Sequence, residues 1–224
     1  MKRLVVIVCL IFFGLAFSAC GTDKKDIVLD NIAEVRYNIF SGENEFYVAT
    51  FMSGERENPY VVNGICEKKI EFGMLSIKYK KQDSPVVAQY SLKIDDKIYN
   101  GNLEYNNYEN TLMVDIQSVV NDDAKITLIV TTNKGEEKCE LFPKTKDLEI
   151  TWRTALDIAL QTLEKDLDEY IVKGKLNGEV YIKIITDLNA TFDTYYWYVS
   201  IVGTNGNTNG VIIDTNTGEV IAKK

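Results

Sequence analysis

Histidine is absent from all 224 residues of this chain. Its absence excludes a Ser-His-Asp triad, a Cys-His dyad, and zinc or copper sites that use histidine ligands. Catalysis by paired carboxylates or by a Ser-Lys arrangement remains open, but no segment of the sequence favours either. We therefore expect no catalytic residue, no metal and no cofactor, and we interpret the protein as a non-enzyme. A hydrolase that works through carboxylates is kept as an alternative.

Basic residues are fewer than acidic ones, since 25 Lys and Arg stand against 33 Asp and Glu, a formal net charge of −8. A protein that binds nucleic acid needs a basic face to replace phosphate counterions, so we expect no nucleic-acid partner. The same balance gives the chain no general attraction to an anionic membrane surface.

The N-terminal residues carry the pattern of a secretory signal. Two basic residues precede an uncharged, apolar run from Leu4 to Phe17, and the small residues Ser18 and Ala19 follow it. The run is too short to span a bilayer comfortably, which takes about 20 residues. We therefore expect residues 1–19 to be a signal peptide that is removed on export.

The residues around the expected cleavage point, Leu15-Ala16-Phe17-Ser18-Ala19-Cys20, resemble the lipobox of bacterial lipoproteins. This resemblance implies cleavage after Ala19 and a diacylglyceryl group on the thiol of Cys20. Because two acyl chains hold a protein stably on a bilayer, the membrane becomes a partner through the lipid on Cys20. We expect localisation at the extracytoplasmic face of the cell membrane, with residues 20–33 as a lipidated tether.

Cysteine is scarce, and two of the four cysteines, Cys9 and Cys20, belong to this N-terminal region. Cys66 and Cys139 remain in the exported part. An exported chain permits a disulfide between them, the one pairing available. Two buried thiols are the alternative, because free cysteine packs as a small apolar group. The sequence spacing leaves both alternatives open.

Period-two alternation of apolar and polar residues recurs from about residue 35 to residue 142, in short segments separated by turn residues such as Asn63-Gly64. Seven or more short strands with one apolar face are typical of an antiparallel sandwich. A phase slip at Gly73-Met74 indicates a β-bulge. We predict an immunoglobulin-like β-sandwich domain over residues 34–147, although the Cys…Trp…Cys pattern of antibody domains is missing.

The periodicity changes in the last third of the chain. Apolar residues from Trp152 to Leu167 follow the spacing of an amphipathic helix, with Thr151 as its N-cap. Four strand-like segments follow, at residues 180–185, 195–202, 211–214 and 220–222. A helix that covers one face of a small antiparallel sheet is an α+β unit, so the predicted fold class is mainly β with α+β.

Three segments of this region resemble the PepSY domain family: residues 155–160 in the helix, residues 196–201 in a strand, and residues 211–220 in the final hairpin. The resemblance implies a small PepSY-like domain over residues 148–224 in an extracytoplasmic protein. By analogy with protease propeptides of that family, it also implies inhibition of a peptidase. The family supplies no catalytic residue.

The final hairpin places Asp214, Asn216 and Gly218 at alternate positions, as at the start of a calcium loop. Such a loop needs glycine at its sixth position, which Glu219 occupies here. We therefore predict a turn in which the Asp214 side chain bonds the backbone ahead and Gly218 takes a positive φ.

Four consecutive aromatic residues, Tyr195, Tyr196, Trp197 and Tyr198, form the candidate interaction surface. Strand alternation places Tyr195 and Trp197 on one face and the other two on the opposite face. One pair is expected to pack under the helix. The other pair is either exposed for contact with a peptide or sugar, or buried against the N-terminal domain.

Together these features predict a membrane-anchored extracytoplasmic lipoprotein that acts as a non-catalytic binding or interaction module. The alternative, based on the PepSY resemblance, is an inhibitor or regulator of an extracellular peptidase or cell-wall enzyme. Its partner is then an envelope protein or a peptidase.

Overall fold

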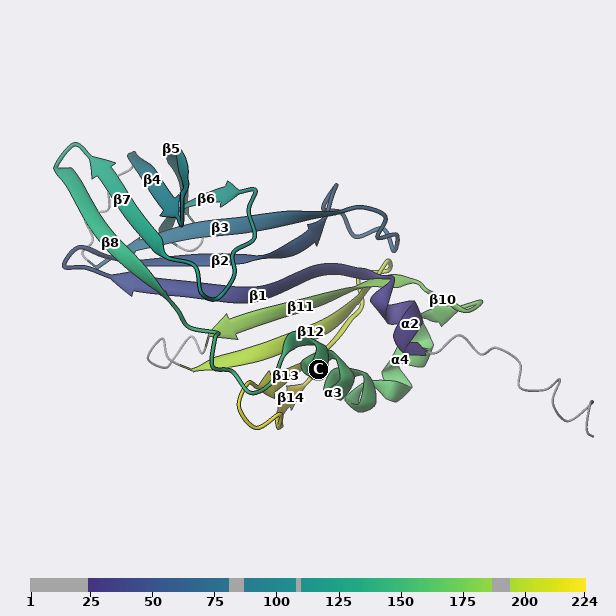
Figure 1. The fold of residues 1–224 in the computed structure, drawn as a ribbon. Coiled ribbons are helices and arrows are strands. Elements are labelled where there is room, and N and C mark those ends of the chain that lie inside the picture. Colours follow the sequence, from purple (N-terminus) through teal and green to yellow (C-terminus); the bar gives the residue numbers. More distant parts are fainter. Residues whose placement is uncertain (1–23, 81–86, 108–109, 187–193) are drawn as a thin grey trace, which may run out of the picture.

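The computed structural model of the chain describes residues 24–80, 87–107, 110–186 and 194–224 (Figure 1). Its helices are α2 (Lys24–Leu29), α3 (Trp152–Thr162) and α4 (Glu164–Tyr170). The first eight strands are β1 (Ile32–Glu43), β2 (Tyr47–Glu57), β3 (Lys69–Tyr79), β4 (Ala88–Ile94), β5 (Lys97–Asn106), β6 (Thr111–Ile116), β7 (Ile126–Thr132) and β8 (Gly135–Pro143). The remaining strands are β9 (Ile171–Val172), β10 (Lys175–Leu176), β11 (Gly178–Thr186), β12 (Tyr195–Gly203), β13 (Thr208–Asp214) and β14 (Val220–Lys223).

Strands β1 to β8 close into an antiparallel barrel. The strand order is β1-β2-β3-β6-β5-β4-β7-β8, and β8 returns to β1 through the pairs Phe40–Pro143 and Ser41–Phe142. Alternation turns every second side chain inward, where burial of apolar surface stabilises the barrel. Its core includes Phe40, Tyr47, Phe51, Leu75, Leu92 and Leu128.

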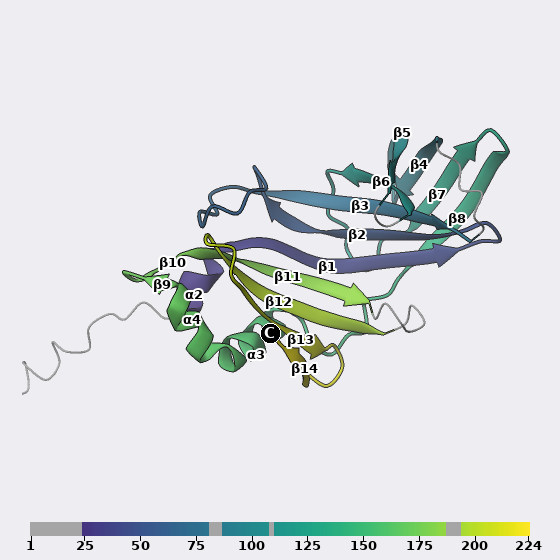
Figure 2. The ribbon, with the colours of Figure 1, turned by 180° about the vertical axis from the view of Figure 1, so that it is seen from behind.

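The first residues of β1 extend beyond the barrel into a second layer. Ile32 to Arg36 pair in parallel with Val180 to Lys183 of β11, and β12, β13 and β14 continue the sheet in antiparallel order. The helices lie along one face of this second sheet, as the two opposite views show (Figures 1 and 2). The second core between helices and sheet includes Val28, Leu156, Leu163, Ile182, Trp197 and Ile213.

The predicted fold class, a β-sandwich followed by a PepSY-like helix-plus-sheet domain, is wrong. The first half is a closed barrel, because β8 pairs with β1 instead of leaving two packed sheets. The C-terminal strands are not an isolated sheet, because they continue through β11 into β1. Sandwiches and barrels share the same alternation of inward and outward residues, so the alternation did not distinguish them.

Two local predictions are confirmed. Thr151 caps α3, since its Oγ1 accepts the N–H of Thr154 at 3.3 Å. Oδ1 of Asp214 accepts two backbone N–H groups ahead of it at 2.8 Å each, and Gly218 has a φ of 74°. The second arrangement fixes the turn between β13 and β14.

Part of the expected N-terminal tether is folded against the rest of the protein. Residues 20–33, the expected tether, contain helix α2 and the first two residues of β1. Ile27 and Val28 of α2 are buried in the second core. The expected signal peptide and the lipidation site Cys20 lie outside the described residues. In the part of the chain that the structure describes, no helix combines the length and apolar content needed to cross a bilayer.

Candidate functional site

A groove opens where β1 and β11 separate. Their parallel pairing ends at Arg36 and Lys183, after which β1 continues along the barrel beside β2 whereas β11 stays with β12 (Figure 1). The groove has a volume of about 460 Å³ and lies between the outer faces of β1, β2 and β3 and the adjoining ends of β11 and β12. Small-molecule sites commonly fall within roughly 300–1,000 Å³.

The groove has an apolar floor on the outer face of the barrel. On β2, Val48 and Met52 line it, whereas the alternate residues Ala49 and Phe51 fill the barrel core. A solvated face of an antiparallel sheet is normally polar, so apolar residues on both faces require another explanation. The apolar lining residues are Ile39, Val48, Met52, Met74, Ile184 and Ile185. Methionine adapts its shape to bound groups, which suits a binding surface.

Hydroxyl groups, two cations and the ring of Tyr195 complete the lining. The hydroxyl residues are Ser41, Thr50, Ser76, Thr111 and Thr186, and the cations are Arg36 and Lys78. No carboxylate stands among the described lining residues, although acids outnumber bases in the chain. The groove is therefore lined by apolar and hydroxyl side chains and by two cations, in a protein that is acidic as a whole.

The two cations differ in how they are held. Arg36 donates through Nε to Glu34, and its Nη1 lies 3.9 Å from Sδ of Met52, so its position is fixed at one end of the groove. Lys78 is exposed on β3, and no described carboxylate forms an ion pair with it. Lys78 is thus the cation whose charge is available to a ligand.

Thr111 supplies an unsatisfied polar atom at the groove. Its side chain lines the groove and is only 7% exposed, and its Oγ1 has no hydrogen-bond partner within the described parts of the chain. A buried hydroxyl without a partner is costly and unusual. Because Oγ1 is shielded from solvent, a ligand accepts a hydrogen bond from it once the side chain rotates toward the groove.

A second polar feature, the carboxylate junction, consists of the buried residues Glu34, Glu57 and Glu179. The carboxylate of Glu34 on β1 accepts hydrogen bonds from the guanidinium of Arg36 and the hydroxyl of Tyr60. It also forms an ion pair with Lys183, whose Nζ lies 3.2 Å away. Burial alone raises the pKa of Glu34, but the bond and charge of Arg36, with Lys183, hold that pKa below its usual value.

Glu179 and Glu57 form the other half of the carboxylate junction. Oε1 of Glu179 accepts the backbone N–H groups of Asn63 and Gly64 at 2.6 and 2.8 Å, and Oε2 accepts the hydroxyl of Tyr181 at 2.8 Å. Burial and the adjacent Glu179 raise the pKa of Glu57 to about 7. Oε1 of Glu57 is buried without a hydrogen-bond partner among the described residues.

The carboxylate junction holds the β2–β3 loop, residues 58–68, against the second sheet. Glu179 is fully buried and both of its oxygens accept hydrogen bonds from the protein, so it is out of reach of a substrate in solution. The hydroxyl of Tyr60 and the amides of Asn63 and Gly64 belong to the loop itself. The arrangement therefore positions the loop, and a cavity of about 350 Å³ opens between the loop and Glu57, smaller than the groove.

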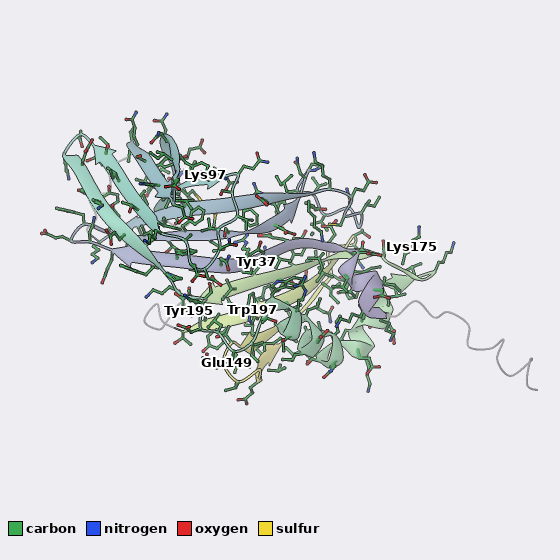
Figure 3. The ribbon with its side chains drawn as sticks, viewed as in Figure 1. Tyr37, Lys97, Glu149, Lys175, Tyr195 and Trp197 are labelled. Carbon is green, nitrogen blue, oxygen red and sulfur yellow. The ribbon has the colours of Figure 1, made fainter. Side chains whose placement is uncertain are left out.

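The aromatic residues predicted as an interaction surface divide as the alternation indicated. Tyr195 and Trp197 are 6% and 2% exposed in the second core, and the Trp197 indole donates to the carbonyl of Ile150 at 2.7 Å. Tyr196 and Tyr198 on the opposite face are half-buried. Figure 3 shows Tyr195 and Trp197 along β12. Of the four, Tyr195 lines the groove.

Cys66 and Cys139 are both free thiols, so of the two alternatives the disulfide does not form. Sγ of Cys66 lies 2.9 Å from the carbonyl oxygen of Ile32, and Cys139 lies against Gly42. Ile32 and Gly42 are near opposite ends of β1, roughly 30 Å apart at about 3.3 Å per residue. A disulfide needs Cα atoms within about 7 Å. Burial raises the pKa of Cys66 to about 11, so its thiol is a poor nucleophile at neutral pH.

Sequence reasoning missed the groove and the carboxylate junction. Met52 and Met74 occupy the outward phase of their strands, and this was the signal available for the groove. In the sequence, Glu34, Glu57 and Glu179 look like ordinary glutamates on a solvent-exposed strand face. Their neighbouring residues give no sign that they are buried. Within the described residues, no group of three or more acidic, cysteine or histidine side chains is placed to hold a metal ion.

No protein-family model, no curated protein and no solved structure matches this chain. The lipobox and PepSY resemblances therefore stay predictions from the sequence.

Proposed function

We propose that this protein is an extracytoplasmic lipoprotein, held on the membrane through Cys20, that binds an amphiphilic ligand in the groove between the barrel and the second sheet. The ligand has an apolar body and an anionic group. The observation that carries the proposal is the groove itself, with its apolar floor, its cations and no described carboxylate.

Each part of the ligand corresponds to part of the groove. The apolar body lies on the side chains of Met52, Met74 and Ile184, where its burial supplies the main binding free energy. The anionic group lies toward Lys78, and Thr111 donates its unpartnered hydroxyl. The protein performs no chemistry on the ligand in this proposal.

Ligand binding is tested with dodecanoate, and with the neutral analogue dodecanol, on the mature chain carrying Cys20→Ser. Titration calorimetry is expected to give saturable binding that is tighter for the carboxylate. Thr50→Trp fills the groove from an outward position on β2, and we expect it to weaken binding about tenfold or more. Dodecanoate affinity that is unchanged in Thr50→Trp contradicts the groove as the site.

The charge is tested separately with Lys78→Gln. Because an exposed ion pair contributes up to about 1 kcal/mol, we expect about fivefold weaker dodecanoate binding and no change for dodecanol. Lys93→Gln is the matched control, because Lys93 is exposed on β4, elsewhere on the barrel.

The membrane attachment is tested in cells that express the full chain. The wild type is expected in the membrane fraction and in the detergent phase of a phase partition. Cys20→Ser, exported with an ordinary secretory signal in place of residues 1–19, is expected to leave both, because neither the lipid nor an uncleaved apolar segment remains. Retention of Cys20→Ser in the detergent phase contradicts attachment through this residue.

A further inference from the structure

Three segments converge at the end of the molecule that includes helix α2. They are α2 itself, the β9–β10 hairpin (Ile171–Leu176) and the β2–β3 loop (58–68), and we call this region the anchor end. The opposite views in Figures 1 and 2 both place these segments at one end, away from β4, β5, β7 and β8. Asn177 joins them, since its N–H donates to Tyr170 at 2.7 Å and its Oδ1 lies 3.1 Å from the hydroxyl of Thr204. Thr204 in turn lies against Gly64 of the loop.

The anchor end concentrates exposed apolar side chains. Five of the eleven exposed large hydrophobic residues in the described parts of the chain are found here: Tyr60, Val61, Val62, Ile65 and Val172. Their exposed fractions lie between 47% and 57%. Scattered exposed hydrophobic residues are normal, but a group gathered at one end marks an interaction surface.

The β2–β3 loop presents these residues from a fixed position. The hydroxyl of Tyr60 donates to Glu34, and its ring meets that of Tyr181 edge-on at 6.1 Å. The amides of Asn63 and Gly64 donate to Glu179. The carboxylate junction thus holds the loop while Val61 and Val62 point to solvent.

Lysines border the apolar side chains. Lys173 and Lys175 are exposed in the β9–β10 hairpin, which contains no acidic residue. Lys68 ends the loop and Lys69 begins β3, and Glu67 is the one acid within the loop. Acids on α4 are also near, and one of them, Asp168, is paired with Lys24 at 2.6 Å. The β9–β10 hairpin is therefore basic, unlike the chain as a whole, whereas the loop balances Glu67 with Lys68.

The expected lipid lies close to this end. Cys20 precedes Lys24, the first residue of α2, by four residues, which span at most about 14 Å when extended. If Cys20 carries lipid, Lys24 at the start of α2 therefore lies within about that distance of the bilayer. We infer that the anchor end is a membrane-contact surface, in which the apolar side chains of the loop and Val172 enter the headgroup region and the lysines contact anionic lipid. This inference rests on the proposed lipid attachment.

Lysine near an anionic bilayer is attracted to it, and valine, isoleucine and tyrosine suit the boundary between headgroups and acyl chains. The contact sets the orientation of the protein, with the barrel directed away from the bilayer. The groove then opens along the side of the molecule.

The test attaches the mature chain to vesicles through a hexahistidine tag placed at residue 20 and a chelating lipid, so that it does not depend on natural lipidation. The chain contains no histidine that competes for the chelator. The vesicles contain one third phosphatidylglycerol in brominated phosphatidylcholine, which quenches tryptophan at the bilayer. Val62→Trp reports on the loop, and Ile98→Trp is the matched control because Ile98 is 60% exposed on β5 of the barrel. Its neighbour Lys97 lies far from Lys175 in Figure 3.

After subtraction of the signal from the native tryptophans, we expect Val62→Trp to be quenched severalfold more than Ile98→Trp. Equal quenching at both positions overturns the inference, and so does no quenching at either. The vesicle test does not depend on the natural lipid, so the two proposals fail separately. If quenching is absent or equal while Cys20→Ser is lost from cell membranes, the contact surface is refuted and the lipid attachment is still supported.

The lysines give a second readout that does not depend on the loop. The untagged chain with Lys173→Gln and Lys175→Gln is expected to bind anionic vesicles about tenfold more weakly than its parent. Binding to purely zwitterionic vesicles is expected to stay the same. The double variant Lys93→Gln with Lys97→Gln is the control for total charge, and an equal loss in that variant overturns the role of the hairpin.

Discussion

The carboxylate of Glu179 on β11 accepts a hydrogen bond from the backbone N–H of Gly64, 115 residues earlier in the chain, at 2.8 Å. Gly64 has a φ of 77°, and a Cβ on it would lie 3.0 Å from Cγ2 of Thr204. Glycine thus provides both the backbone conformation and the space that this contact needs. The β2–β3 loop is therefore held from β11 rather than by the two strands that it connects.

Glu179→Ala is expected to lower the free energy of unfolding by about 3 kcal/mol, because it leaves two loop amides and the Tyr181 hydroxyl without an acceptor. Glu179→Gln keeps an amide oxygen as acceptor and is expected to cost about 1 kcal/mol. Urea unfolding of the mature chain measures both. Glu104→Ala, exposed on β5, is the control, and equal effects at the two positions contradict the role of Glu179.

The pKa of Glu57 gives the stability a pH dependence. Burial and Glu179 raise this pKa from 4.5 to about 7, so between these values the folded protein binds a proton that the unfolded chain has released. Stability therefore falls as the pH rises from about 4.5 to about 7. The contribution of this one group is about 3 kcal/mol at the upper limit.

Glu57→Gln keeps the neutral form at every pH. We expect it to be more stable than the wild type at about pH 8 and nearly equal to it at about pH 5, because only the wild type has to bury a charge at the higher pH. Urea unfolding at the two pH values measures the difference, with Glu104→Gln as the control. A difference between wild type and Glu57→Gln that does not change with pH refutes the assignment.

Thr111 separates stability from binding. Since its Oγ1 is buried without a partner, Thr111→Val removes an unsatisfied polar atom and is expected to raise the free energy of unfolding by about 1 kcal/mol. The same change removes a donor from the groove, so dodecanoate binding is expected to weaken. Thermal unfolding and calorimetry on one preparation test both effects. Loss of stability in Thr111→Val shows that the hydroxyl already has a partner in the protein.

Local features of the fold followed from the sequence because they depend on neighbouring residues. The Thr151 cap and the turn at Asp214 and Gly218 involve contacts within a few positions. The predicted bulge at Gly73-Met74 is wrong, because β2 and β3 pair in unbroken register through this region. Gly73 is instead the point where β3 begins to pair with β6 and lies against the ring of Phe51. The alternation of buried and exposed residues along β3 changes at Gly73 because β3 gains β6 as a second neighbour there.

The candidate site depended on contacts that no local pattern contains. The groove exists because β1 pairs with β11, almost 150 residues later, and then leaves it. The burial of Glu34 and Glu179 depends on the same pairing, and their sequence neighbours suggest only a polar strand face. Alternation predicts which side chains share a face, but it does not predict what covers that face.

Closure of the barrel depends on Gly42. A Cβ at this position would lie 2.0 Å from the backbone oxygen of Glu140 and 3.1 Å from Sγ of Cys139. A backbone oxygen cannot move away as the end of a flexible side chain can, and β1 meets β8 through only two register pairs in the described structure. Gly42→Ala is therefore expected to separate β8 from β1 and to lower the free energy of unfolding by about 3 kcal/mol.

The separation is measured by the reactivity of Cys139, which is 4% exposed in the barrel core and whose thiol pKa is raised by burial. In a Cys66→Ser background, Gly42→Ala is expected to speed modification of Cys139 by a thiol reagent at least tenfold, because opening of the barrel exposes the thiol. Ser91→Ala on β4 is the control for a small change within the barrel. Unchanged reactivity in Gly42→Ala means that β1 and β8 tolerate a side chain between them, and that the closed barrel does not require glycine at this position.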